Sequence, residues 1–176
     1  FTMNNEVLQN IRTRRSCRAY TAQQVEPEKL KAILEAGTWA ASGHGWQAAK
    51  IVVLQDAAEI AELERMNAAV LGNPAAHPFY GAPVVCVVLT DPERYTCVED
   101  GSLVMGNLML AAHSLGVASC WIHRARQEFD SPEGKALLKK WGVDERYIGV
   151  GHCILGYAAA EPAPAKPRKA DLIIRA

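Results

Sequence analysis

The stretch Pro83-Val84-Val85-Cys86-Val87-Val88-Leu89-Thr90 carries the strongest structural signal in this chain. Every residue between the proline and the threonine is apolar, and no polar position alternates with them. A strand of this kind has no face that suits water, so it is typical of the inside of a sheet that is covered on both sides. We therefore expect residues 83–90 to form a central strand in a sheet clad in helices.

Apolar periodicity and breaker residues predict the other elements of the chain. Strands are expected at 51–54, 117–123 and 147–157, and helices at 5–13, 27–41, 57–69, 100–116 and 131–141. Pro27 begins one of these helices, and Ser131 caps another, with Pro132 at its first helical position. Strands and helices alternate along the chain without internal repeats, which fits the α/β or the α+β class.

Length and composition predict one domain that spans residues 3–176. The chain has 176 residues and is 49% hydrophobic, which suits one core and is too little for two. Residues 158–176 are rich in alanine and proline and are expected to form an extended tail. Phe1 and Thr2, which precede Met3, are interpreted as an added remnant or an incomplete start and are left out of the fold.

The charge balance excludes some classes of partner. Nineteen basic and nineteen acidic residues cancel, whereas a protein that binds nucleic acid or a membrane surface would need a patch of one sign. The apolar runs are too short to span a bilayer, and residues 1–10 lack the pattern of a signal peptide. Five cysteines without a CxxC pair fit a reducing, cytoplasmic location, and five scattered histidines do not predict a metal site.

The helix expected over Asp100–Gly116 is apolar almost all round. A helix without a polar face is buried either inside its own domain or against a partner subunit, and Gly116 is a natural stop for it. We therefore expect this helix to belong either to the core or to an interface between two copies of the chain.

The stretch Arg14-Arg15-Ser16-Cys17-Arg18 gathers three arginines and a serine within five residues. The planar guanidinium group matches the oxygens of phosphate or carboxylate, and a serine hydroxyl adds a further hydrogen-bonding group. This cluster favours a bound anion, with phosphate as the first hypothesis. The alternative is a solvated basic turn at the end of a helix, where cations interact favourably with the helix dipole.

Several catalytic and nucleotide-binding signatures are missing from the chain. It has no GxGxxG after a strand, no Walker GxxxxGK[ST] and no GxSxG elbow. The stretch Gly149-Val150-Gly151 lacks the third glycine of a dinucleotide-binding loop. Glu99 and Asp100 stand at a predicted helix start, where acidic residues are more typical of a cap than of a catalytic pair.

Four segments, read together, resemble the FMN-dependent nitroreductase family. Arg14–Tyr20 is similar to the RRSxRxY opening of that family, and Ala41–Gln47 stands where the family has an APSxxNxQP loop. Residues 100–115 and then Gly116–Ile122 are similar to its buried central helix and its GxxSCWI strand. Ile154–Tyr157, with the prolines and basic residues that follow, looks like its closing LGYP…P…R signature.

This resemblance, which covers about residues 5–170, implies an α+β fold with a central, mostly antiparallel sheet flanked by helices and with FMN at a homodimer interface. It implies an oxidoreductase that uses NADH or NADPH to reduce a nitroaromatic, quinone or related small-molecule acceptor. Hydride would pass in ping-pong fashion through N5 of the flavin, so no catalytic side chain is expected. Enone reduction, dehalogenation and azoline oxidation stay open as alternatives, as does a non-enzymatic flavin- or anion-binding regulatory domain.

The resemblance also implies which residues hold the phosphate end of FMN. The phosphate and the ribityl chain would be bound by the cluster near the start of the chain, namely Arg14, Ser16 and Arg18. Arg15 would lie beside the pyrimidine side of the flavin. Lys166 and Arg168 would return from the C-terminus to the same phosphate.

Three further segments are implied to line the flavin ring. They are Ser42, Gly43, His44 and Gln47 in a loop from the other subunit, Trp121, Ile122 and His123 in a strand whose backbone faces N5, and Asn67 as a mid-chain amide. Judged from the residues alone, Trp121 and His123 fit a core or strand-edge position as well.

Two departures from the family pattern fall in the second loop. Gly45 stands in place of the usual asparagine, and Ala48-Ala49 stand in place of the usual Pro-Trp. An amide and an aromatic ring are thereby removed, so the substrate pocket is expected to be wider or differently shaped, and the role of Gln47 is left open.

Overall fold

A four-stranded sheet forms the centre of the computed structural model, which describes residues 3–176. The interpretation of Phe1 and Thr2 therefore lies outside the described residues. The strands are β1 (Ala49–Leu54), β2 (Val84–Thr90), β3 (Ala118–Ile122) and β4 (Ile148–Gly156). They lie in the order β1-β2-β4-β3, and each pair of neighbours is antiparallel.

The central position of β2 is confirmed. It pairs with β1 on one side and with β4 on the other, and all seven of its residues are buried. All nine residues of β4 are buried as well. A register shift between Val88 and Leu89 interrupts the pairing of β2 with β4. The two inner strands therefore require cover on both faces.

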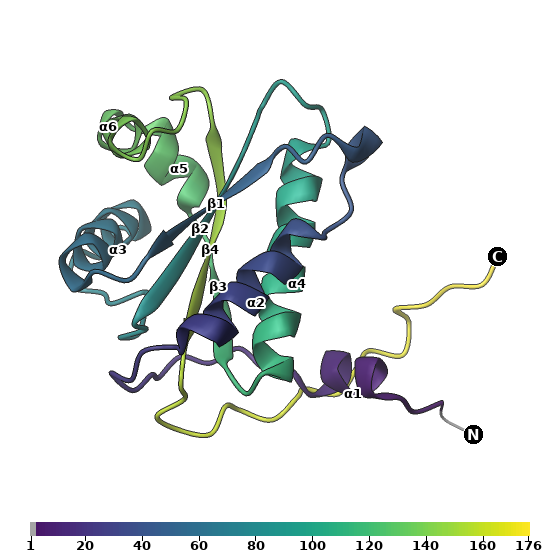
Figure 1. Cartoon of the computed structure of the whole chain (residues 1–176). Helices are drawn as coiled ribbons and strands as arrows, with labels where there is room; N and C mark the ends of the chain where they lie inside the picture. The colour runs from purple at the N-terminus through teal and green to yellow at the C-terminus, as the bar shows by residue number, and fades with distance from the viewer. Residues whose placement is uncertain (1–2) are drawn as a thin grey trace.

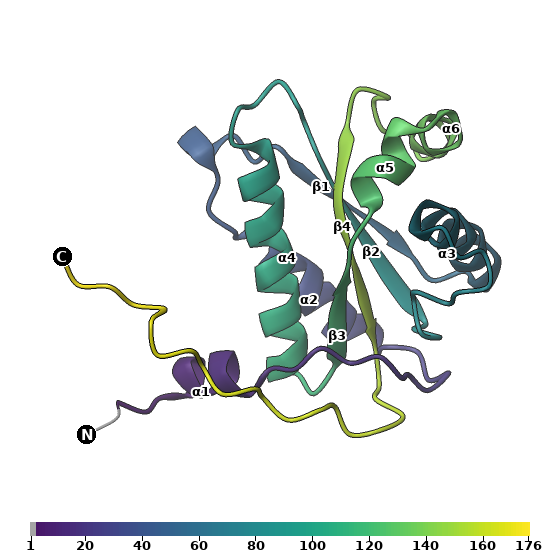
Figure 2. The same ribbon diagram turned by 180° about the vertical axis from the view of Figure 1, so that it is seen from behind.

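Helices supply that cover in two layers (Figures 1 and 2). Helices α2 and α4 lie on one face of the sheet, and α3, α5 and α6 lie on the other. The bounds are α1 (Glu6–Thr13), α2 (Pro27–Thr38), α3 (Ala57–Leu71), α4 (Cys97–Ser114), α5 (Ala125–Asp130) and α6 (Pro132–Lys140). The predicted α+β class and the flanked antiparallel sheet are thus confirmed. Helix α5 is absent from the sequence prediction because six residues are too few to establish a helical period.

Local sequence explains where these helices begin and end. The side chain of Ser131 accepts a hydrogen bond from the Gly134 N–H at 3.0 Å, with Pro132 in the first turn of α6, as predicted. The side chain of Asp56 accepts from two N–H groups in the first turn of α3. That helix ends at Gly72, whose φ of 77° is the left-handed conformation that glycine adopts without strain.

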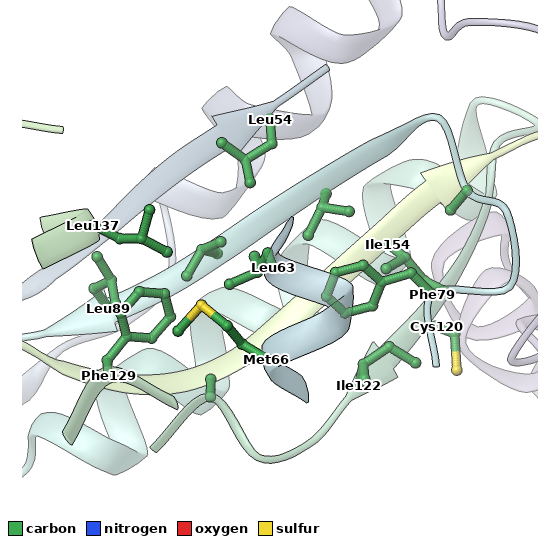
Figure 3. Packing of buried hydrophobic residues seen from close by; sticks show 14 of the residues in the cluster. Leu54, Leu63, Met66, Phe79, Leu89, Cys120, Ile122, Phe129, Leu137 and Ile154 are labelled. Atoms are coloured by element: carbon green, nitrogen blue, oxygen red, sulfur yellow. The ribbon is translucent and has the colours of Figure 1, made fainter. Parts of the chain in front are cut away.

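Two apolar clusters fill the spaces on either side of the sheet. The cluster under α3, α5 and α6 joins Leu63, Phe79 and Phe129 to residues of the strands (Figure 3). The second cluster, under α2 and α4, includes Met105 and Leu108 of α4. Among residues 3–176, no helix has both the length and the apolar composition needed to cross a membrane.

The N-terminal segment and the tail meet at the edge of the sheet formed by β3. Ser16 forms a parallel bridge with Ser119, and the N–H of Cys17 donates to the Ser119 carbonyl at 3.0 Å. Tyr20 forms an antiparallel bridge with Ala158, where the tail begins. The tail then leaves the body of the molecule alongside α1 (Figures 1 and 2). This arrangement brings two segments from opposite ends of the sequence together.

One glycine in β4 is required for the close packing of α5 on the sheet. A Cβ atom at Gly149 would lie 2.3 Å from the Ala125 carbonyl oxygen, which is a backbone atom that cannot simply rotate away. We expect Gly149→Ala to lower the free energy of unfolding by about 3 kcal/mol, because the overlap forces α5 away from the strand. Gly142→Ala, which strains a left-handed residue in open space, should cost only about 1 kcal/mol. Urea denaturation of both variants checks this order, and equal losses would contradict it.

Candidate functional site

A basic cavity of about 490 Å³ lies between the end of α1 and the tail. The N-terminal segment contributes Arg14, Arg15 and Ser16, and the tail contributes basic residues that include Lys166 and Arg168. Lys169 is the fifth cationic residue of the lining, which contains no acidic residue. In a chain whose formal net charge is zero, this local excess of positive charge suits an anionic ligand.

Helix α1, which directly precedes Arg14 and Arg15, is held against α4. The Asn10 side chain donates from Nδ2 to the Leu110 carbonyl at 2.9 Å. A second contact joins Thr13 Oγ1 to His113 Nε2 at 2.8 Å. Since α1 ends at Thr13, the arginines that follow emerge directly into the space between α4, β3 and the tail.

The two adjacent arginines differ in how their charge is satisfied. Arg15 donates from Nη1 to the Arg12 carbonyl at 2.9 Å, so it satisfies a carbonyl in the last turn of α1, as a basic residue at a helix end does. Nη1 of Arg14, in contrast, is buried and has no hydrogen-bond partner. Ser119 Oγ is likewise buried without a partner. A buried, unpaired charged donor costs free energy, so Arg14 favours a bound anion over a merely solvated turn.

A second cavity of about 520 Å³ adjoins this cluster. Arg14, Arg15, His113 and Ser119 line it, together with residues of the tail. The pKa of His113 lies below its ordinary value because burial disfavours the charged ring and because Arg14 and Arg15 repel it. The charges of the two arginines thus act on the imidazole in the lining of this cavity.

Arg18 is placed differently from its neighbours. Its side chain is exposed, and it is not among the residues that line either cavity. It does lie near β3, where burial raises the pKa of the Cys120 thiol and the charge of Arg18 opposes that shift. The structure therefore unites Arg14, Arg15, Ser16, Lys166 and Arg168, and leaves Arg18 at the margin.

The loop that contains Ser42, Gly43, His44 and Gln47 lies at the other end of α4. The Asp100 carboxylate, in the first turn of α4, accepts from the Gly43 N–H at 3.0 Å and from Thr96 Oγ1 at 3.1 Å. Asp100 lies 13 residues before His113, which corresponds to about 20 Å along the helix axis. Within one chain, this loop and the arginines are thus separate.

The backbone of this loop is strained and carries an aromatic cluster. His44 and Gln47 have φ values of 52° and 50°, in the left-handed region that side chains rarely adopt. The His44 ring stacks on Trp46 with centroids 4.6 Å apart, and Tyr95 meets Trp46 edge-on at 5.3 Å. Strain of this kind collects at functional sites.

An apolar cavity of about 790 Å³ begins beside the same loop. Ser42 and Gln47 belong to its lining, and residues of α2, α4 and β1 supply most of the apolar remainder, together with a few polar side chains such as Lys31 and Glu35. Ala48 and Ala49, where the resembling family has a larger aromatic residue, also belong to the lining. Their side chains are small, and the expected change in the width or shape of the substrate pocket stays a prediction.

The end of β3 holds the remaining predicted site residues. Trp121 packs against Gly151, where an added Cβ would lie 2.7 Å from the indole nitrogen, and Ile122 is buried in the core. His123 is exposed. Asn67 is fully buried, and its Nδ2 donates to the His123 carbonyl at 2.9 Å. Its contact with the flavin stays a prediction. Within this chain, its amide already makes hydrogen bonds to other residues.

Three residues of this region escape sequence reasoning. Asp100 reads as a helix cap, and only the tertiary structure reveals that its carboxylate clamps the loop at Gly43. His113 and Ser119 lie in an apolar helix and strand, and nothing in their local sequence indicates that they face the arginines.

The sequence and the fold of this chain are similar to those of known proteins. Residues 11–157 match the profile of the nitroreductase family. The chain is 33% identical to a nitroreductase with bound FMN from Bacteroides fragilis NCTC 9343, with a TM-score of 0.91 over 98% of this chain and 100% of that chain. A second FMN-bound nitroreductase, from Desulfitobacterium hafniense DCB-2, is 29% identical, with a TM-score of 0.89 over 99% and 100%.

A relative from Archaeoglobus fulgidus extends the comparison to sequence alone. This protein, provisionally named an NADH dehydrogenase/NAD(P)H nitroreductase, is 31% identical over 161 residues, which are 89% of this chain and 87% of the relative. The profile match covers most of the chain, and the relatives share its length. The chain therefore belongs to the nitroreductase family and is an oxidoreductase.

Proposed function

We propose that this protein is an FMN-dependent oxidoreductase that uses NAD(P)H to reduce a nitroaromatic, quinone or related acceptor. The observation that carries the proposal is the convergence of five cationic residues on one cavity, with the buried Nη1 of Arg14 unpaired among them. Two solved relatives hold FMN, and its phosphate is an anion that such a cluster suits.

The phosphate anchor is built from both ends of the chain. Arg14 and Arg15 follow α1, and Lys166 and Arg168 return along the tail to the same cavity. Ser16 adds a hydroxyl donor, and its bridge to Ser119 fixes the segment to the sheet edge. Charge-assisted hydrogen bonds from these groups would hold the phosphate more strongly than neutral donors could.

A second copy of the chain completes the proposed site. The outer face of α4 remains apolar in one chain, where Leu103 is 50% exposed, and the tail ends in Leu172, Ile173 and Ile174, which are 64%, 81% and 87% exposed. Exposed apolar surface of this extent is typical of an interface. A two-fold dimer that pairs α4 in antiparallel fashion would bring the Ser42–Gln47 loop of one copy to the arginines of the other.

The side chains of the site position the cofactor and the substrate rather than react. When bound, FMN supplies hydride transfer between NAD(P)H and the acceptor at N5 of its ring. The loop at Ser42–Gln47, clamped by Asp100, would cover the ring and exclude water. The wide apolar cavity beside it, with Ala48 and Ala49 in its wall, keeps enone reduction, dehalogenation and azoline oxidation open as alternatives.

Flavin content and turnover test the proposal directly. The purified chain should be yellow, release FMN on denaturation, and oxidise NADH or NADPH when a quinone or nitroaromatic is added. Flavin binding without NAD(P)H oxidation, with any acceptor offered, would favour a non-catalytic flavin-binding domain. A colourless protein with no affinity for added FMN would overturn the proposal.

Removal of Arg14 should weaken FMN binding. We expect Arg14→Ala to raise the Kd for FMN about ten- to a hundredfold, because one charge-assisted phosphate contact contributes about 1.5–3 kcal/mol. Arg168→Ala, far away in the sequence, should have an effect of the same size. Flavin fluorescence titration measures both. Arg12→Ala removes the same charge from a residue that lines neither cavity, and an equal loss there would point to long-range charge instead of contact.

The ionisation of His113 should respond to FMN. Burial, and in addition the charges of Arg14 and Arg15, hold its pKa below the ordinary value in the free chain. A phosphate bound between these arginines offsets their charge, so we expect the His113 pKa to rise when FMN binds. Proton NMR of the imidazole across a pH titration, with and without FMN, measures the shift. The ring signals of His77, which contacts Glu64 of α3, serve as the control and should not respond.

A charge on the outer face of α4 should separate the subunits. We expect Leu103→Glu to yield a folded monomer that loses FMN, because the glutamate would be buried without a partner in the interface. Light scattering together with flavin absorbance across one column peak measures both properties. Val70→Glu, at a similarly exposed residue of α3, should stay dimeric. A yellow monomer of Leu103→Glu would contradict the shared site.

A further inference from the structure

A buried polar network lies behind the end of β3, away from the phosphate cluster. Its members come from three elements and one turn: Asn67 of α3, Glu128 of α5, His152 of β4 and Arg124, which precedes α5. Asn67, Glu128 and His152 are all buried to within about one percent. The proposed function assigns no role to Glu128, His152 or Arg124.

Asn67 is the centre of the network because its amide makes three hydrogen bonds, through both N–H groups and through its oxygen. Its Nδ2 donates to the His123 carbonyl and to Glu128 Oε2, each at 2.9 Å. Its Oδ1 accepts from Arg124 Nε at 2.9 Å. One amide thus connects α3 to both residues of the turn that follows β3, and to the helix that follows the turn.

Glu128 and His152 extend the network into the sheet. Glu128 Oε2 lies 2.6 Å from His152 Nε2, and the rings of Phe79 and Phe129 pack around the imidazole at centroid distances of 5.3 and 6.2 Å. Glu128 Oε1 and His152 Nδ1 have no partner. A buried network that is only partly satisfied is less stable than apolar side chains of the same size. We therefore expect this network to fix the position of the backbone that it contacts, and not to raise the stability of the fold.

The part of the chain that this network holds is the turn over Ile122–Arg124. Arg124 adopts a φ of 81°, a left-handed conformation that costs free energy for a residue with a side chain. The amide of Asn67 bonds both His123 and Arg124. On the other side, α5 begins in direct contact with Gly149 of β4. The strained turn is thus fixed from both directions.

We propose that Asn67, Glu128 and His152 are positioning residues that hold the backbone of Ile122–Arg124 in the orientation needed beside the flavin ring. This inference rests on the proposed function, in which the end of β3 faces the ring. Backbone groups that are fixed before the reaction need no reorganisation during it, and a displacement of about 1 Å can cost a hundredfold in rate. The role proposed for the three side chains is exerted through the backbone that they hold, and it requires no contact between them and the cofactor.

Matched substitutions separate positioning from stability. Glu128→Leu and Asn67→Leu keep the side-chain size and remove the hydrogen bonds, whereas Glu128→Gln keeps a carbonyl oxygen that can accept from both Asn67 Nδ2 and the N–H of His152 Nε2. Leu63 lies in the same helix as Asn67 and belongs to the apolar cluster under α3, α5 and α6. Leu63→Ala therefore destabilises the core without removing a hydrogen bond of the network. Arg124→Asn removes the bond to Asn67 while keeping a residue that tolerates the left-handed backbone.

Two measurements on the chain of 176 residues test the inference. Amide hydrogen exchange of residues 122–124, followed without FMN, should accelerate at least tenfold in Glu128→Leu and Asn67→Leu, and should stay near wild type in Glu128→Gln and Leu63→Ala. The rate constant for reduction of bound flavin by NAD(P)H should fall about tenfold in the same two variants, while the Kd for FMN changes less than threefold.

The outcomes are distinguishable from a failure of the proposed function. If the wild-type chain binds no FMN, the proposed function fails, and the exchange data alone decide whether the network holds the turn. Folded leucine variants with wild-type exchange and reduction rates would overturn the inference, as would an equal loss in Leu63→Ala. If neither leucine variant folds, Arg124→Asn decides, because wild-type rates in that variant would also overturn it.

Discussion

The burial of β2 and β4 along their entire length is the constraint on which the rest of this structure depends. Two adjacent strands with no residue facing water need a layer on each face, and the chain supplies these layers as α2 with α4 and α3 with α5 and α6. The centre of the domain is thereby closed to ligands. The candidate site residues therefore lie at the edges of the sheet, in β3, in the tail and in the loop before β1, where a second molecule can approach.

Two groups of buried polar side chains lower the stability of this largely apolar fold. The Nη1 of Arg14 is buried without a partner, and the same is true of Glu128 Oε1 and His152 Nδ1. Both arrangements lower stability in the free chain. For the arginines, the cost would be offset by an anion. For the buried network, the gain lies in the fixed backbone at Arg124, a strained conformation that packing alone does not require.

Helix α4 sets the distance between the two halves of the proposed site. Asp100 in its first turn clamps the Ser42–Gln47 loop, and His113 in its last turn faces the arginines. A rigid helix keeps these about 20 Å apart in one chain. Met105 and Leu108 place this helix in the core, whereas Leu103 faces outward, where the proposed interface would lie.

The sequence by itself determined the elements, because apolar periodicity records burial directly. The strand at 83–90, the ends of α3 and α6 and the family resemblance all followed from local pattern. The short helix α5 did not, since six residues carry no period. The meeting of Arg14 with Lys166 and Arg168 was expected only through the resemblance. The clamp at Asp100, the margin position of Arg18 and the bonded state of Asn67 were decided by the tertiary structure. These features depend on contacts between residues far apart in the chain. Such contacts produce no pattern in the local sequence around either residue, so the sequence does not predict them.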